Sequence, residues 1–290
     1  MATNTPFGQR LGLVLEGGAM RGIYTAGVLD VFLEAGIMPD VVVGVSAGAL
    51  HGCSYVAGQK GRSIRYYRKY RSDKHFMGLY SLLTTGDVVG TKFCYEDIPL
   101  RLDPFNEAAF EKAPVDFYVT VTNVRTGKPE YILCDELKVG SKMDVIRAGA
   151  SMPLCSKMVE WNGNLYLDGG VSDSIPYAKM KDFGCRKSIV VLTQPAGYLK
   201  QPAAMAPFEA MYRKYPAFVE AMRGRDQMYN TEVCAVEQAT KKGDVFLIRP
   251  SKLLHVGRME HDIEVLNAQY ELGRQDARNQ MDAMREWMER

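Results

Sequence analysis

One stretch of the sequence decides the fold: Asp40-Val41-Val42-Val43-Gly44-Val45-Ser46-Ala47-Gly48. An apolar run leads straight into the pattern G-x-S-x-G, and helical spacing follows to about Tyr55. A strand that becomes a helix at such a pattern holds its serine in a strained elbow near the positive end of the helix. Gly44 and Gly48 are required because a side chain there would collide with the neighbouring strand or helix. The pattern predicts that Ser46 is a nucleophile.

The residues around this elbow predict an α/β fold. An apolar run over 11–15 is broken by Gly17-Gly18, and helical spacing over 23–35 ends at Gly36. Two strand–helix units with short connections favour a parallel sheet covered by helices. Asn162-Gly163 predicts a hairpin with a type I′ turn. Further strands are predicted over 116–124, 130–134, 157–161, 164–168, 188–193 and 244–248.

Three regions have another character. Residues 60–114 are polar and predict irregular structure, with helices of a cap or insertion. Residues 204–242 are predicted to be mostly helical. The tail has apolar residues at helical spacing, which predicts one long helix packed on the body. These residues are Ile263, Leu266, Tyr270, Ala277, Met281 and Met284.

Composition narrows the class of protein. The chain has 290 residues, of which 47% are hydrophobic and 24% charged, as in an ordinary soluble globule with one large domain or a domain plus an appendage. A net charge of +2 gives no general reason to expect nucleic acid. Residues 1–6 lack the build of a signal peptide, and no window predicts a membrane span, so a cytoplasmic protein is expected. Six scattered cysteines predict small buried hydrophobes rather than a disulfide or zinc framework: Cys53, Cys94, Cys134, Cys155, Cys185 and Cys234.

A serine nucleophile needs donors for the oxyanion that forms during acyl transfer. The loop Glu16-Gly17-Gly18-Ala19-Met20-Arg21-Gly22 lies between the first strand and its helix. Its small residues at 17–19 let main-chain N–H groups approach a carbonyl oxygen, and the helix dipole favours negative charge there. Because the ends of adjacent parallel strands meet at one edge of the sheet, this loop is expected to face Ser46.

The reaction also needs a base. His51 lies five residues after Ser46 on the same predicted helix, so it points elsewhere; His75, His255 and His261 do not lie at strand ends. Asp168 ends a predicted strand and is followed by Gly169-Gly170, which leave its carboxylate unhindered. Partial burial would raise its pKa from about 3.9 towards that of a useful base. Asp168 is therefore the better candidate, although this sequence also suits a plain turn.

Together, E-G-G-A-M-R-G, G-V-S-A-G and D-G-G in this order resemble the patatin-like phospholipases over about residues 11–182. The resemblance implies a three-layer α/β/α fold and a catalytic Ser–Asp dyad of Ser46 and Asp168. It also implies an oxyanion hole from the amides of Gly17, Gly18 and Ala19, with no metal or other cofactor. The supporting motif positions are Arg21, Gly22, Gly44, Gly48, Gly169 and Gly170.

The sequence departs from the family's pattern at two positions. Glu16 replaces the usual aspartate, and Ala19 replaces the third glycine. Alanine disfavours positive φ, so the loop geometry is expected to differ slightly. Residues 183–290, which include Ile248-Arg249-Pro250 and Val256-Gly257-Arg258, look like the last core strand and the mostly helical C-terminal extension of a bacterial branch of the family.

The resemblance implies a serine acyl hydrolase of lipid, phospholipid or lysophospholipid esters. One alternative is a non-catalytic module that binds lipids or anions on the same fold. A nucleotide-binding protein is the other, but Ala19 breaks G-x-G-x-x-G, and no Lys-Ser/Thr pair follows Gly22 as a P-loop requires. Arg21 either attracts an anionic head group or lies on a helix face.

Residues 60–74 contain seven basic residues and three tyrosines, Tyr66, Tyr67 and Tyr70. This composition predicts either a solvated helix face or a peripheral contact with an anionic membrane.

Overall fold

The centre of the molecule is a mostly parallel sheet. The computed structural model describes residues 6, 8–253 and 255–290, so the stretch on which the absence of a signal peptide was predicted lies mostly outside the described residues. Strands follow the order β5-β6-β3-β2-β1-β7-β8, and β4 pairs with β3. β1, β2, β3, β7 and β8 pair in parallel, whereas β4, β5 and β6 pair antiparallel. The strands are β1 (Arg10–Leu15), β2 (Val41–Val45), β3 (Asp116–Asn123), β4 (Pro129–Leu133), β5 (Val159–Trp161), β6 (Asn164–Asp168), β7 (Cys185–Val191) and β8 (Val245–Ile248).

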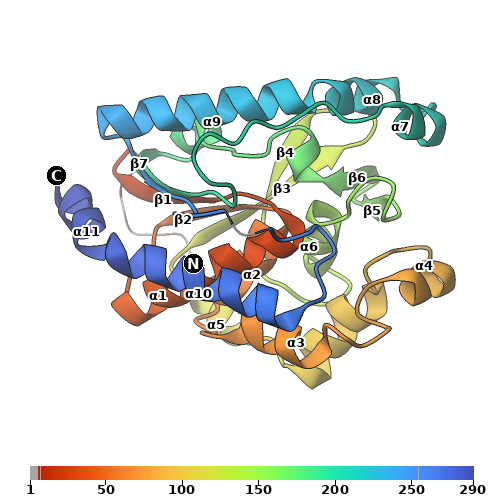
Figure 1. The fold of residues 1–290 in the computed structure, drawn as a ribbon, viewed down its shortest axis with the longest axis horizontal. Helices are drawn as coiled ribbons and strands as arrows, with labels where there is room; N and C mark the ends of the chain where they lie inside the picture. The colour runs from red at the N-terminus through yellow and green to blue at the C-terminus, as the bar shows by residue number, and fades with distance from the viewer. Residues whose placement is uncertain (1–5, 7, 254) are drawn as a thin grey trace.

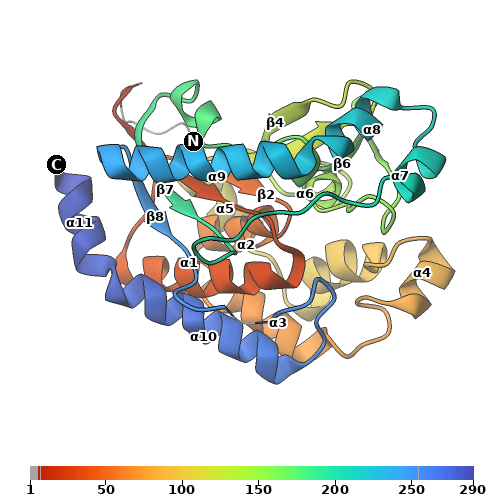
Figure 2. The same cartoon turned by 45° about the horizontal axis from the view of Figure 1, so that its top comes forward.

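Helices cover both faces of this sheet, which confirms the three-layer α/β/α prediction. Helix α9 runs along one face, and α1, α2 and α10 lie on the other (Figures 1 and 2). The helices are α1 (Ile23–Ala35), α2 (Ala47–Val56), α3 (Arg62–Tyr70), α4 (Leu79–Thr85), α5 (Glu107–Lys112), α6 (Met143–Gly149), α7 (Ala206–Met211), α8 (Pro216–Arg223), α9 (Arg225–Lys242), α10 (Ile263–Asn279) and α11 (Met281–Glu289). Three short 3-10 helices are η1 (Ala19–Gly22), η3 (Gly169–Val171) and η4 (Ala178–Lys181), and η2 (Phe93–Leu102) is a π-helix.

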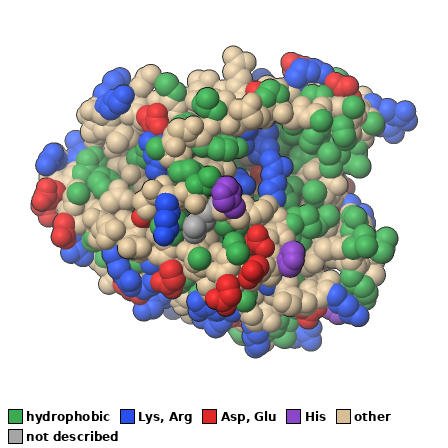
Figure 3. All heavy atoms as spheres, viewed as in Figure 1, with side chains coloured by type: hydrophobic (Ala, Val, Ile, Leu, Met, Phe, Trp, Pro, Cys, Tyr) green, Lys and Arg blue, Asp and Glu red, His purple; other side chains and the backbone are tan. Residues whose placement is uncertain are grey.

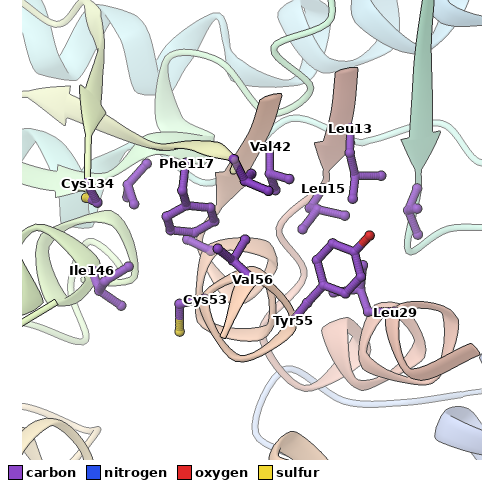
Figure 4. Packing of buried hydrophobic residues seen from close by; sticks show 14 of the residues in the cluster. Leu13, Leu15, Leu29, Val42, Cys53, Tyr55, Val56, Phe117, Cys134 and Ile146 are labelled. Carbon is purple, nitrogen blue, oxygen red and sulfur yellow. The ribbon is translucent and has the colours of Figure 1, made fainter. Parts of the chain in front are cut away.

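Alternating side chains on the strands build two cores. Leu13 and Leu15 of β1 pack with Phe117 and the residues of α1 and α2 (Figure 4), whereas Val14 packs on the opposite side with residues of α9. Side chains of successive strand residues point to opposite faces, so one apolar run can fill both layers. Burying each large apolar side chain contributes roughly 1.5–3 kcal/mol. Both cores hold the strand ends that carry the site in a fixed relation.

The C-terminal segment is part of this arrangement. Strands β7 and β8 extend the sheet beyond β1, and α10 packs on α1. The helices approach closely because glycines face each other's backbone: a Cβ on Gly27 would lie 2.1 Å from the carbonyl oxygen of Tyr270, and a Cβ on Gly273 would lie 2.1 Å from that of Tyr24. A division of the chain at residue 182 stays a prediction.

The tail departs from the predicted single long helix, because α10 and α11 are separated at Gln280. The break turns α11 towards the edge of the sheet. There the Trp287 indole N–H donates a hydrogen bond of 2.7 Å to the Gly243 carbonyl, and its ring lies 5.7 Å from that of Phe246. The apolar spacing continues through Gln280, so spacing alone could not reveal the bend.

Other local predictions have mixed outcomes. Asn162 and Gly163 have φ of 46° and 76°, as a type I′ turn between β5 and β6 requires. Residues 60–114 are more regular than predicted, with α3, α4, η2 and α5, and they bury several aromatic side chains.

The cysteines are free thiols, but Cys234 is exposed and Cys94 and Cys155 are only partly buried, so the prediction of buried hydrophobes was wrong for these. Among the described residues, none of the helices is both long and apolar enough to span a membrane.

Candidate active site

Ser46 lies in the sharp turn between β2 and α2. Its φ of 53° and ψ of −122° put it in a backbone conformation that is unfavourable for any residue with a side chain. The flanking glycines make this turn possible, because a Cβ on Gly44 would lie 2.5 Å from the Cα of Ala49, and one on Gly48 would lie 2.3 Å from the Leu15 carbonyl oxygen. These contacts are the physical reason for the pattern G-x-S-x-G.

The Ser46 hydroxyl points at the carboxylate of Asp168. Its Oγ donates a hydrogen bond of 2.6 Å to Asp168 Oδ2, across 122 positions of sequence. The other carboxylate oxygen, Oδ1, accepts 2.8 Å from the Gly170 amide at the start of η3. Gly169 permits this turn, since a Cβ there would lie 2.2 Å from the Thr120 carbonyl oxygen. The sheet therefore brings together the two residues that the sequence singled out, and it fixes the carboxylate from both sides.

The surroundings of Asp168 favour a carboxyl group of raised basicity. Burial raises its pKa above the ordinary value, because the charged form loses its hydration. The Ser46 hydrogen bond, the positive charge of Arg225 and the Gly170 amide oppose this effect but do not cancel it. A carboxylate of this kind can accept a proton from a neighbouring hydroxyl more readily than an exposed one.

The glycine loop lies directly against the elbow. A Cβ on Gly17 would lie 2.8 Å from the Ser46 Cβ, so only a residue without a side chain lets the loop approach this closely. Ala19 adopts a φ of 48° despite its methyl group. Holding an alanine in this region costs about 1 kcal/mol, so the loop stores some strain at this position. The loop and Ser46 face one another as predicted.

Glu16 ties this loop to two other parts of the chain. Its carboxylate accepts 2.5 Å from the amide of Thr193, just after β7, and 3.0 Å from the hydroxyl of Tyr229 on α9. The Thr193 hydroxyl in turn donates 3.2 Å to the Gly17 carbonyl. The longer glutamate in place of the usual aspartate therefore reaches partners that hold the loop in place.

The four histidines lie elsewhere. His51 is buried, its Nδ1 is 3.0 Å from the Ser63 hydroxyl, and burial lowers its pKa to about 3. His75 pairs with Asp73, and His255 and His261 are exposed. Within the described ranges, none of them lines either cavity at Ser46, and no cluster of three or more His, Cys, Asp or Glu side chains could hold a metal ion.

Two cavities meet at Ser46. The first, which we call the acyl chamber, is mostly apolar and extends below α2. Its walls include Leu50, Tyr67, Phe76, Tyr95, Ile98 and Met152, and one charged side chain, Arg62, which is paired with Asp103. The second, which we call the cationic chamber, also contains Asp168 and the glycine loop, and four basic side chains line it: Arg21, Lys200, Arg225 and Arg258. Figure 3 shows basic side chains beside the hollow beneath the junction of α8 and α9. Ser46 thus separates an apolar compartment from a charged one.

The sequence reasoning missed three of these four cations. Lys200 follows β7, Arg225 begins α9, and Arg258 lies in the loop before α10. Nothing in the tripeptide Val256-Gly257-Arg258 indicates a role in the site. Lys200 and Arg225 reach the cavity through the segment after β7 and through α9, and Arg258 through the loop that leads into α10, which packs on α1. This placement is long-range and has no local signal.

The basic stretch 60–74 has its tyrosines on the inside. Tyr66, Tyr67 and Tyr70 are buried, and the first two line the acyl chamber. Arg65, Arg68 and Lys69 face solvent, among other residues of the stretch. The aromatic residues are therefore not available for contact with a membrane.

Comparisons with known proteins match two parts of the chain. Residues 13–180 match the family model described as patatin-like phospholipase, and residues 215–289 match a domain of unknown function (DUF6363). An uncharacterized protein, YjjU of Escherichia coli (strain K12), is 29% identical over 91% of this chain and 75% of its own length.

Relatives that match a shorter part of the chain have named activities. Lysophospholipases from Aspergillus terreus and Saccharomyces cerevisiae are both 30% identical, over 61% and 63% of this chain. The matched part is 11% of the length of each of these proteins. Among solved structures, VipD from Legionella pneumophila aligns with a TM-score of 0.48 and 13% identity, over 96% of this chain and 67% of that one.

Proposed function

Because this chain belongs to the patatin-like phospholipase family, we propose that it hydrolyses carboxylic esters of lipids through an acyl-Ser46 intermediate. The observation that carries the proposal is the 2.6 Å hydrogen bond from Ser46 Oγ to Asp168 Oδ2 at the meeting point of an apolar and a cationic chamber. The relatives named as lysophospholipases support the same class of substrate.

In the first half of the reaction, Asp168 takes the proton of the Ser46 hydroxyl as Oγ attacks the ester carbonyl carbon. The carbonyl oxygen becomes an oxyanion and accepts hydrogen bonds from main-chain amides of Gly17, Gly18 and Ala19. The intermediate collapses, the bond to the alcohol oxygen breaks, and Asp168 returns the proton to that oxygen. The products are a free alcohol and an acyl-Ser46 ester.

In the second half, water replaces the alcohol. Asp168 accepts a proton from the water as its oxygen attacks the acyl carbon, and the same amides hold the second oxyanion. Collapse breaks the bond to Ser46 Oγ, which recovers its proton from Asp168. A fatty acid leaves, and the resting enzyme is restored without a metal or organic cofactor.

The acyl chamber suits the hydrocarbon chain of the substrate. Apart from Arg62, which is paired with Asp103, its walls are mostly apolar and aromatic, and it begins at Ser46 itself. An alkyl chain gains roughly 0.8 kcal/mol for each CH₂ group removed from water. The acyl group is therefore bound below α2, and the alcohol part points into the cationic chamber.

We further propose that the protein meets its substrate at a membrane surface through α4. Leu79 and Leu83 of this helix are 70% and 76% exposed. Met77 and Val89 flank this helix in the sequence and pair with each other in an antiparallel β-bridge. Both residues line the acyl chamber. Green side chains at the right of Figure 3 border the notch on the sides of α4 and α7.

Charge and apolar exposure occur together at this rim. Lys74 and Lys92 are exposed near the two ends of the α4 segment, and the Lys74 ammonium lies 4.5 Å from the centre of the Tyr80 ring. Exposed leucines next to lysines suit an anionic lipid surface. We assign the contact to α4 rather than to residues 60–74, whose tyrosines are buried.

A fluorophosphonate probe tests the central proposal. It should label Ser46 covalently, with the modified residue identified by mass spectrometry, and Ser46→Ala should abolish both labelling and hydrolysis of a lysophospholipid. Ser251→Ala, at an exposed serine outside both chambers, is the matched control and should behave as wild type. Labelling of another serine would contradict the proposed nucleophile, and lipid binding without any turnover would favour the non-catalytic module.

A further inference from the structure

We propose that the cationic chamber is a phosphate-binding subsite, and that the C-terminal segment, whose matched domain has no known function, supplies most of it. Lys200, Arg225 and Arg258 all follow the patatin-like segment that ends at residue 180. Arg21 comes from the glycine loop. This inference rests on the proposed function for its lipid substrate, and it narrows that substrate to esters that carry a phosphate.

The four basic side chains lack the partners that such residues usually have. In the described part of the chain, none of them has a carboxylate oxygen within 4.0 Å, whereas Arg10, Arg65 and Arg274 each form ion pairs. The Nε atom of Arg21 is buried and has no hydrogen-bond partner. Arg21, Lys200 and Arg225 are partly buried and Arg258 is exposed. Cations that lose part of their hydration are normally paired, so this cluster has the composition of a site that awaits an anion.

Two of these cations are held in place by neighbours that leave charge unneutralised. The Arg225 Nε donates 2.5 Å to the Gly170 carbonyl. The main chain of Lys200 exchanges hydrogen bonds of 2.9 and 3.1 Å with the side chain of Asn230, and its ammonium lies 4.2 Å from the centre of the Tyr229 ring. Neutral contacts of this kind position the cations without cancelling their charge.

The two carboxylates in the chamber do not balance the cations. Glu16 and Asp168 are committed to other donors: Thr193 and Tyr229 for the first, Ser46 and Gly170 for the second. Even with both ionised, two of the four positive charges remain uncompensated. Burial lowers the pKa of Lys200 and of Arg225, and the charges of the other cations lower each of them further. The cations repel one another, and a bound dianion would relieve that repulsion.

The basic side chains of the chamber and its position beside Ser46 indicate phosphate as the anion. Guanidinium groups match phosphate oxygens in bidentate hydrogen bonds, and a lysine adds a point charge. The chamber opens on Ser46, so the anion would sit within a few bonds of the ester carbonyl under attack. A phosphate on the alcohol part of a glycerolipid has that separation. The acyl chamber and the phosphate site would then bind opposite ends of one substrate.

A matched pair of substrates tests the inference. Monooleoylglycerol and oleoyl-lysophosphatidic acid differ only in the phosphate, and wild type should prefer the second in kcat/KM. Lys200→Gln combined with Arg258→Gln should lower that preference about ten- to a hundredfold, the range of one or two lost charge-assisted hydrogen bonds. Lys241→Gln, at an exposed lysine near the far end of α9, is the control and should leave the preference unchanged.

A binding measurement separates this inference from the proposed reaction. Calorimetry with inorganic phosphate on the Ser46→Ala protein should show saturable binding that the double variant loses while its melting temperature stays close to that of the parent. Phosphate binding without a substrate preference would assign the site to free phosphate instead of a lipid head group. Absence of phosphate binding, together with an unchanged preference in a folded double variant, would overturn the subsite. If the Ser46→Ala protein binds phosphate but wild type hydrolyses neither substrate, the result would instead count against the proposed reaction.

Discussion

Arg225 and Gly170 are joined by a hydrogen bond of 2.5 Å from the guanidinium Nε to the main-chain carbonyl. This contact connects the first residue of α9 to the turn that carries Asp168. The same guanidinium lowers the pKa of Asp168 through its charge, against the larger effect of burial. A residue of the C-terminal segment therefore acts on the proposed base through both geometry and charge.

Replacing Arg225 should move the pH profile of the enzyme. Activity requires ionised Asp168, so kcat/KM for a soluble neutral ester should fall as pH drops through the raised pKa of that carboxyl. Arg225→Gln removes a positive charge, which raises that pKa further, and the acid limb should shift to higher pH. Lys241→Gln should show no shift. An acid limb that stays in place in the folded Arg225→Gln protein would contradict a direct charge effect on Asp168.

The roles of Asp168 and the histidines can be separated by substitution. Asp168→Asn should lower activity by about 10²–10⁴-fold, as expected for a missing general base, because an amide cannot accept the proton. Each histidine replaced by glutamine should keep activity within a few-fold, with circular dichroism to confirm folding of the buried His51 variant. One inactive, folded histidine variant combined with an active Asp168→Asn protein would replace the dyad by an ordinary triad.

Local sequence was sufficient to predict the turn that carries Ser46, but not the basic residues of the cationic chamber around it. The contacts that require Gly44 and Gly48 involve neighbours that any strand-turn-helix unit provides, so the pattern alone predicted the position of Ser46. The hydrogen bond to Asp168 followed from two strand ends in one sheet. The positions of Arg225 and Arg258 depend instead on α9, which covers one face of the sheet, and on the loop before α10, a helix that packs on α1 (Figure 1). No short pattern encodes either placement.

The basic stretch illustrates a different limit. Tyr66, Tyr67 and Tyr70 have the spacing of one helix face, and that face packs inward against the acyl chamber. The prediction placed the basic residues and the tyrosines on one surface, whereas the structure buries the tyrosines and exposes basic residues such as Arg65 and Arg68. The exposed leucines of α4 lie just beyond the stretch, where the sequence was interpreted as irregular and polar.

Membrane binding should depend on α4. Leu79→Ser combined with Leu83→Ser should weaken cosedimentation of the Ser46→Ala protein with vesicles that contain anionic phosphatidylglycerol. Each lost leucine contact is worth roughly 1.5 kcal/mol or more, which corresponds to about tenfold per residue. Leu133→Ser, at an exposed leucine on β4, is the matched control. Equal binding by both variants would remove α4 from the membrane contact.

Besides Asp168, the carboxyl group of Glu232 on α9 should make the stability of the protein depend on pH. Glu232 accepts hydrogen bonds from the amides of Ser174 and Ile175, and burial together with the nearby Asp173 raises its pKa above 4.5. The folded protein then retains a proton that the unfolded chain releases, so the free energy of unfolding should decrease as pH rises from about 4.5 towards the raised pKa. Glu232→Gln should flatten this part of the profile in denaturant titrations. A variant with the wild-type slope would show that Glu232 does not cause it.

Lys200 is surrounded by charged and titratable groups from several elements. They are Glu16 at the end of β1, Arg21 in η1, Arg225 and Tyr229 on α9, and Arg258. Burial, followed by the charge of Arg225, lowers the pKa of Lys200 to about 8. The ammonium should therefore be lost as pH rises through that value, and the preference for a phosphate-bearing substrate should fall with it.

Lysophosphatidylglycerol compared with monooleoylglycerol measures this effect, because the phosphodiester keeps one negative charge across the range. Lys200→Arg keeps its charge, so its preference should stay level where that of wild type declines. Bound phosphate stabilises the ammonium form, so saturation with inorganic phosphate should protect Lys200 from amine-directed acetylation near pH 8. A decline in Lys200→Arg equal to that in wild type would show that another group titrates, and Lys200 would then have no part in the selectivity.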